Sequence, residues 1–354
     1  MSGFLANDSH VHAFKFDDLE TILEMIKEYQ YEFITVQGLS CCGGERQANN
    51  FISIALKAMQ PKSIFVNGTF LYPKNGGAFS PEIALQQVKH QMLCGFDGIK
   101  MLEGKPYVRK YTGIPLDSEY YEPAFSYMEK EGIPLELHVA DPEEFFSAKL
   151  CPEWAKGRGH GWYDKDVLPK EELEREALGI VKRHPGLKVS LAHWFFQSAS
   201  YEKSVELLET YPNVFLDIVP GWEMYGNFTK DYDRFRELFT KYSERIIFGS
   251  DNLMVNWREI ANAIFRFLET DDTFTAGEAG LIFSEPDMLI RGMNLPQEVL
   301  KPILRDNFFK FYKKPKELDY DRILAWAKEF AKEYDNPISL EQSVERIREY
   351  SERS

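Results

Sequence analysis

The sequence predicts an α/β fold, a (β/α)8 barrel with a C-terminal helical extension. Short runs rich in β-branched residues alternate with amphipathic helical segments, and this pair occurs eight times along the chain. Such alternation is typical of parallel strands, and eight units favour a closed barrel over an open sheet. No Gly-x-Gly-x-x-Gly motif follows the first strand, which argues against a dinucleotide-binding sheet. The 354 residues can form one large barrel.

Each unit can be placed along the chain. The expected strands cover residues 7–13, 33–36, 63–67, 98–101, 134–139, 188–193, 214–219 and 245–251. The helices that follow them are expected at residues 18–29, 46–59, 80–94, 120–131, 170–183, 201–210, 231–242 and 257–268. Apolar residues recur every three or four positions in these helices, so each can bury one face against the sheet.

After the eighth unit the pattern becomes purely helical. Residues 300–311, 319–334 and 339–353 read as helices, with Pro315 and Pro337 as breaks. Aromatic residues such as Phe308 and Trp326 predict that this part packs on the barrel. We therefore expect one domain, with the barrel in residues 1–312 and a packed helical extension in residues 313–354.

Composition restricts the partners. The net charge of -14 provides no basic surface for nucleic acid or anionic membrane, so a small-molecule partner is favoured and homo-oligomerisation stays open. The first residues lack the features of a signal peptide, and no apolar stretch reaches eighteen residues. We expect a cytoplasmic protein. Its four cysteines match no zinc or redox spacing and are expected to be free thiols: Cys41, Cys42, Cys94 and Cys151.

Five polar side chains close predicted strands, where barrels carry their catalytic groups. They are His10 and His12 on the first strand, His138 on the fifth, His193 on the sixth and Asp251 on the eighth. Taken singly, each has an ordinary explanation, such as a hydrogen-bonded core histidine or a helix-capping aspartate. Together on one rim they predict a metal site, because burying so many unpartnered polar groups would be costly. His90 and His184 are expected at the surface.

The ordered set of His10-x-His12, His138, His193 and Asp251 resembles the amidohydrolase superfamily, in particular the amidohydrolase-related family of TIM-barrel hydrolases and decarboxylases. The resemblance implies that His10, His12, His138 and Asp251 bind one divalent ion, with His193 beside it. Such a mixed nitrogen and oxygen site suits Zn²⁺, while Mn²⁺, Fe²⁺ and Co²⁺ stay open. The ion would activate a water molecule, with Asp251 as general base and His193 orienting the water or polarising a carbonyl.

Lys100, at the end of the fourth strand, leaves the number of ions open. Two-metal members of the superfamily carry a carboxylated lysine there. In that alternative His10, His12 and Asp251 would hold one ion, and His138 and His193 the other. We favour a single ion, with Lys100 unmodified and available to a substrate carboxylate.

Substrate residues are expected in the long loops after the strands. Residues 104–111 are basic and aromatic, and residues 141–168 could form a lid. The candidate substrate-binding residues are Lys100, Arg109, Arg158 and Trp194. The leading interpretation is a metal-dependent hydrolase of an ester, lactone or amide in a small, carboxylated substrate. A non-oxidative decarboxylase of the same family is the alternative, and a non-catalytic barrel with a binding role is the remote one.

Overall fold

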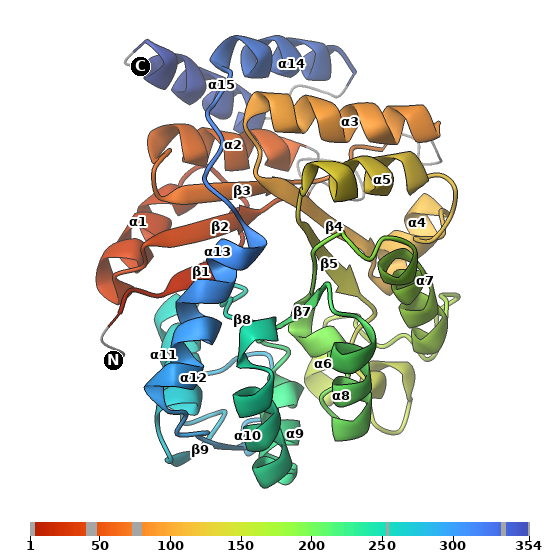
Figure 1. Cartoon of the computed structure of the whole chain (residues 1–354), viewed down its shortest axis with the longest axis vertical. Coiled ribbons are helices and arrows are strands. Elements are labelled where there is room, and N and C mark those ends of the chain that lie inside the picture. The colour runs from red at the N-terminus through yellow and green to blue at the C-terminus, as the bar shows by residue number, and fades with distance from the viewer. Residues whose placement is uncertain (1–3, 40–47, 73–79, 253–254, 334–337, 353–354) are drawn as a thin grey trace.

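A parallel eight-stranded sheet forms the centre of the molecule (Figure 1). The computed structural model describes residues 4–39, 48–72, 80–252, 255–333 and 338–352. The strands follow one another in sequence order. They are β1 (Asn7–Val11), β2 (Phe33–Gln37), β3 (Ile64–Gly68), β4 (Gly98–Gly104), β5 (Leu135–Val139), β6 (Val189–Leu191), β7 (Val214–Asp217) and β8 (Ile246–Ile247).

Backbone hydrogen bonds join the first and last strands. The Ser9 N–H donates to the Phe248 carbonyl at 3.0 Å, and the Asp251 N–H donates to the His10 carbonyl at 2.8 Å. Val11 and Asn252 form a parallel bridge. The sheet therefore closes, and the predicted (β/α)8 TIM barrel with a helical extension is confirmed. Closure also brings the two ends of the predicted site together.

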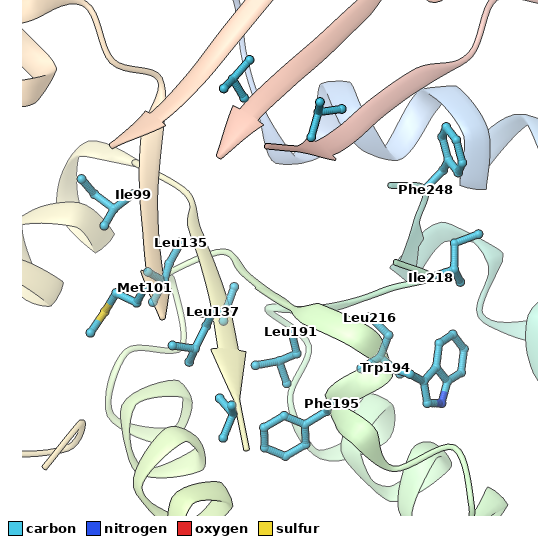
Figure 2. Packing of buried hydrophobic residues seen from close by; sticks show 14 of the residues in the cluster. Ile99, Met101, Leu135, Leu137, Leu191, Trp194, Phe195, Leu216, Ile218 and Phe248 are labelled. Atoms are coloured by element: carbon cyan, nitrogen blue, oxygen red, sulfur yellow. The ribbon is translucent and has the colours of Figure 1, made fainter. Parts of the chain in front are cut away.

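The helices that follow the strands along the chain surround the barrel. They are α1 (Asp18–Tyr29), α2 (Asn49–Met59), α3 (Pro81–Cys94), α5 (Glu122–Glu131), α7 (Lys170–Arg183), α8 (Tyr201–Thr210), α10 (Tyr232–Lys241) and α11 (Trp257–Glu269). Figure 2 shows Ile99, Met101, Leu135 and Leu137 packed in the apolar core. The same cluster contains residues of these helices, such as Phe125. Because side chains alternate along a strand, the intervening residues of β4 and β5 point to the barrel interior.

Several helical segments of the described residues were not expected from the sequence. α4 (Pro106–Thr112) lies within the segment interpreted as a basic loop, and α9 (Trp222–Lys230) follows β7. Pro106 in the first turn and Gly113 at the C-cap, with φ of 67°, are ordinary helix boundaries. The loop after β5 contains two short helical segments, η2 (Glu143–Phe146) and α6 (Glu153–Gly157). A hairpin of β9 (Thr273–Thr275) and β10 (Leu289–Arg291) follows α11.

The C-terminal helices pack on the barrel. α12 (Gln297–Lys301) and α13 (Asn307–Phe311) are joined by a π-helical turn over Pro302–Asp306, in place of the uniform helix expected at 300–311. Phe308 and Tyr312 pack against Phe65 at the amino-terminal end of β3. α14 (Tyr320–Glu333) and α15 (Ile338–Ser351) lie beside α3 and α2 (Figure 1). The domain boundary at residue 312 stays a prediction.

Cys94 and Cys151 are free and buried, whereas Cys41 and Cys42 lie outside the described residues. Among the helices of the described ranges, none has the length and apolarity needed to cross a membrane.

Candidate active site

Three of the predicted metal ligands converge where β1 meets the end of β8. His10 Nε2 and His12 Nε2 are 3.2 Å apart, and Asp251 Oδ1 lies 3.1 Å from His12 Nε2 and 3.7 Å from His10 Nε2. The two histidines are buried, and Asp251 keeps 22% of its side chain exposed. The ligand atoms of these three residues lie within 4.8 Å of one another, which is close enough to share an ion.

The hydrogen bond made by Nδ1 of an imidazole determines whether its Nε2 presents a proton or a lone pair to the other two residues. His12 Nδ1 lies 3.1 Å from the Gln37 carbonyl oxygen, which can only accept, so Nδ1 is the donor. A neutral His12 therefore directs the lone pair of Nε2 toward Asp251 Oδ1, another acceptor. Two acceptors at 3.1 Å need a proton or a cation between them. The donor set consequently fits a divalent metal ion.

Asp217 supports His10 from behind. Its Oδ2 lies 3.2 Å from His10 Nδ1, and its Oδ1 accepts the backbone N–H of His193 at 2.7 Å. Glu136, on β5, is also buried, with Oε1 3.6 Å from His10 Nδ1. Sequence reasoning missed both carboxylates. Asp217 closes β7, so the strand-end rule could have found it. Glu136 is two residues before His138 on β5, so the alternation of side chains along the strand could have placed it on the same face as His138.

His138 does not join the three-residue group. Its Nε2 lies 3.1 Å from the Ala140 carbonyl oxygen, so its Nδ1 is free to accept, and that atom faces His193 Nε2 at 3.2 Å. The structure thus separates the predicted residues into two groups: His10, His12 and Asp251, and then His138 with His193. This is the grouping expected for the two-ion alternative.

A strained turn places His193. His193, Trp194, Phe195 and Phe196 have φ between 49° and 57°, a left-handed turn without glycine. Such residues cost roughly 1 kcal/mol or more each, so the surrounding contacts must hold them in place. The His193 ring stacks on Phe196 at 5.0 Å, and Asp217 binds the His193 N–H. The Trp194 side chain is part of the apolar core instead (Figure 2). Its ring stacks on Phe239.

Electrostatics favours the neutral forms of His10 and His193 and an ionised Asp251. Burial, together with the charge of Lys100, lowers the pKa of His10 well below its usual value and that of His193 to about 4. Burial acts to raise the pKa of Asp251, but the close contact with His12 and the neighbouring His193 and His10 hold it below its usual range. Neutral imidazole and carboxylate are the forms that bind metals.

A cavity of about 220 Å³ opens above the site. His138, His193 and Asp251 line it together with aromatic residues of the loop after β5, among them Phe145 and Trp154. This loop is held by Asp141, whose Oδ2 accepts the Trp162 indole N–H at 2.9 Å. The loop therefore covers the rim at the place where the sequence suggested a lid.

The expected substrate residues do not line the cavity. Lys100 is buried below it, with Nζ 3.2 Å from His10 Nε2. Arg109 forms a two-point ion pair with Glu176. Arg158 is exposed, and its guanidinium carbon lies 4.5 Å from the centre of the Phe283 ring. Trp194 is buried in the core. Protein groups thus already contact Lys100 and Arg109, and Trp194 is buried, whereas Arg158 is exposed. Substrate contact by these four residues stays a prediction.

Two histidines and one lysine lie in other surroundings than the sequence indicated. His184, expected at the surface, is buried with Nδ1 3.0 Å from Glu129, and His90 is half-buried against Trp326. Lys105 lines the cavity, although it was not predicted to do so; its Nζ lies 2.6 Å from Asp141 Oδ1. It is the one Lys or Arg among the described cavity residues.

Comparisons with known proteins agree with this architecture. The model of the family described as amidohydrolase matches residues 72–314, a range that contains Lys100, His138, His193 and Asp251 but not His10 and His12. No curated protein matches the chain. More than half of the chain is nevertheless covered by the family model.

Among solved structures, the chain is similar to a probable 2-pyrone-4,6-dicarboxylic acid hydrolase from Acinetobacter baumannii with citric acid bound. The identity is 12%, the match covers 87% of this chain and 99% of that one, and the TM-score is 0.52, which supports the fold alone. A dihydroorotase from Saccharomyces cerevisiae is 14% identical, with 91% and 87% coverage and a TM-score of 0.47. An IDCase from Metarhizium anisopliae is 13% identical, with 83% and 78% coverage and a TM-score of 0.46. On the family match, this chain belongs to the amidohydrolase family.

Proposed function

We propose that this chain is a metal-dependent hydrolase that uses activated water to cleave an ester, lactone or amide bond in a small molecule. The observation that carries the proposal is the convergence of His10 Nε2 and His12 Nε2 on Asp251 Oδ1, a residue that lines the cavity, with the His12 lone pair directed at the carboxylate. When bound there, a divalent ion, with Zn²⁺ preferred over Mn²⁺, Fe²⁺ or Co²⁺, supplies a Lewis acid that activates water and polarises a carbonyl group.

Asp251, His193 and the loop after β5 each contribute a different function to the proposed reaction. Asp251 is ionised and partly exposed to the cavity, so it can accept a proton from water and return it to the leaving group. His193 is neutral and lines the same cavity, where it can hydrogen-bond the reacting oxygen. The aromatic residues of the loop after β5 limit access of bulk water.

The expected carboxylate on the substrate is not retained. Lys100 and Arg109 are engaged elsewhere, and Lys105 is already paired with Asp141. Among the described residues, the cavity thus offers no unpaired cationic side chain to a carboxylate. The substrate class has to be inferred from other cavity residues.

The number of ions is tested by elemental analysis of the purified protein together with the electron density at Lys100. One ion per chain and an unmodified lysine are expected. Two ions with a carboxylated lysine would replace the single-ion assignment, and the pairing of His138 with His193 would then supply the second site.

The reaction is tested with a panel of esters, lactones, amides and carboxylic acids followed by mass spectrometry. Products that have gained one water molecule support hydrolysis. Products that have lost carbon dioxide would contradict it and establish the decarboxylase alternative. Only trace metal, together with unchanged stability of a His10→Asn variant, would support a non-catalytic barrel.

A further inference from the structure

A carboxylate that the proposed reaction does not use also faces the cavity. Glu223 is the second residue of α9 and lines the cavity with His193 and Asp251. Gly221 makes room for it: a Cβ at Gly221 would lie 2.8 Å from Glu223 Oε2 and 3.1 Å from Phe196 Cε1. The carboxylate therefore lies beside Phe196, the ring that stacks on His193.

Within the described part of the chain, Glu223 Oε1 is buried without a hydrogen-bond partner. Lys170 is a candidate for a structural ion pair, since its positive charge acts on Glu223. However, Lys170 Nζ donates to the Phe196 carbonyl at 2.5 Å and lies 3.6 Å from Glu174 Oε1. A buried carboxylate oxygen without a partner is costly, and Glu223 is a lining residue of the cavity, so a cationic partner of this carboxylate can be supplied from the cavity.

The rest of the cavity indicates the chemistry of that partner. Much of the cavity lining is apolar or aromatic, with Phe145, Trp154 and Phe283 among its residues. The cationic residue Lys105 is neutralised by Asp141. An aromatic pocket with one unpaired carboxylate suits a small apolar or aromatic molecule that carries a protonated amine.

We propose that Glu223 is a specificity-determining residue that binds the ammonium group of an amine-bearing substrate. The inference rests on the proposed function for the identity of the bound molecule as a substrate, and it names the substrate class of that site. Burial, followed by the negative charge of Glu144, raises the pKa of Glu223 to about 8, with Lys170 and Asp141 as the other charged groups acting on it. Near neutral pH an arriving ammonium ion should therefore displace a proton.

Benzylamine is the probe, and benzyl alcohol and benzoate are its neutral and anionic counterparts. Binding is measured by titration calorimetry on the as-purified full chain, with the metal content of the same sample recorded. Glu223→Gln should weaken benzylamine binding about tenfold or more, because a charge-assisted hydrogen bond is lost, and should not weaken benzoate binding. Calorimetry in buffers of different ionisation enthalpy should show proton release with benzylamine on the unmodified protein only.

Two further variants test the position of the Glu223 carboxylate and provide a control. Gly221→Ala should also weaken benzylamine binding, because its Cβ displaces the carboxylate without removing the charge. Glu143→Gln, an exposed carboxylate of the loop after β5 outside the cavity lining, should leave binding unchanged. Thermal melts confirm that each variant folds.

Equal benzylamine affinity in the unmodified protein and Glu223→Gln, or no measurable binding to the unmodified protein, would overturn the proposal. Weakened benzoate binding in Glu223→Gln would also overturn it, since Glu223 would then act as a protonated donor to anions. Failure of the hydrolase proposal is seen separately, as absent metal or turnover in samples that still discriminate benzylamine through Glu223.

Discussion

His12 Nε2 lies 3.1 Å from Asp251 Oδ1, although the two residues are near opposite ends of the barrel sequence. The contact exists because β1 and the segment after β8 exchange backbone hydrogen bonds, including His12 N–H to the Asn252 carbonyl at 3.0 Å. Closure of the barrel is thus also the step that assembles the site. A mutation that weakens this contact should affect metal binding before it affects the fold.

His12→Asn is expected to remove one converging nitrogen and to lower metal affinity at least about 100-fold, since even outer-shell changes cost about 10–100-fold. Metal titration with a chelator competitor measures the loss. His90→Asn is a suitable control, because His90 lies on α3 against Trp326. Equal metal affinity in the two variants would exclude His12 as a ligand.

Asp251→Asn should retain appreciable metal but lose turnover about 100-fold or more, because an amide cannot accept the proton from water. The rate constant kcat and the metal content are measured on the same preparation, with a substrate identified in the panel. Full activity in Asp251→Asn would rule out Asp251 as the base.

Asp217→Asn tests the support behind His10. The amide retains one acceptor for the His193 N–H but loses the negative charge beside His10 Nδ1. We expect metal affinity to fall about 10–100-fold while the variant stays folded. Unchanged affinity, measured in the same chelator competition, would assign Asp217 to holding the His193 turn alone.

Arg109→Met tests whether Arg109 contacts the substrate or only forms the ion pair with Glu176. Glu176 accepts from the Arg109 guanidinium at 2.9 and 3.0 Å and from the Leu116 N–H at 2.9 Å. Loss of the arginine leaves Glu176 buried with an uncompensated charge, so the free energy of unfolding should fall by about 3 kcal/mol. Urea unfolding measures the change, and KM should not move. A raised KM with unchanged stability would identify Arg109 as a substrate residue.

Glu103→Gln tests a buried carboxyl on β4 that accepts the Tyr72 hydroxyl at 2.7 Å. Burial raises its pKa from 4.5 to about 7. The folded protein therefore holds this proton more tightly, and the associated stability is full below pH 4.5 and is lost as the pH rises through about 7. The pKa shift corresponds to about 3 kcal/mol of unfolding free energy that is lost as the pH rises, and the glutamine variant should not show this loss.

Urea unfolding at pH 5 and pH 8 checks this expectation. The drop in unfolding free energy between these two values should be smaller in Glu103→Gln than in the unmodified protein. Glu131→Gln, at the end of α5, is the control and should keep the full drop. Identical pH dependence in Glu103→Gln and the unmodified chain would show that Glu103 stays ionised.

The sequence by itself determined the eight strand-helix units and the rim on which the chemistry lies. Both follow from local rules: apolar periodicity identifies the elements, and parallel strands place their carboxyl ends on one side. His10, His12 and Asp251 could therefore be assigned to one site before any coordinate was known. The predicted hydrolase or decarboxylase class follows from the family resemblance those residues carry.

Only the tertiary structure decided which side chains meet. It paired His138 with His193, placed Asp217 behind His10, and directed Trp194 into the core through a left-handed turn. These outcomes depend on rotamers and on contacts between residues far apart in sequence, which periodicity does not encode. Glu223 could not be predicted from the sequence for the same reason. Its place in the cavity lining and its unpartnered Oε1 depend on how α9 packs on the barrel.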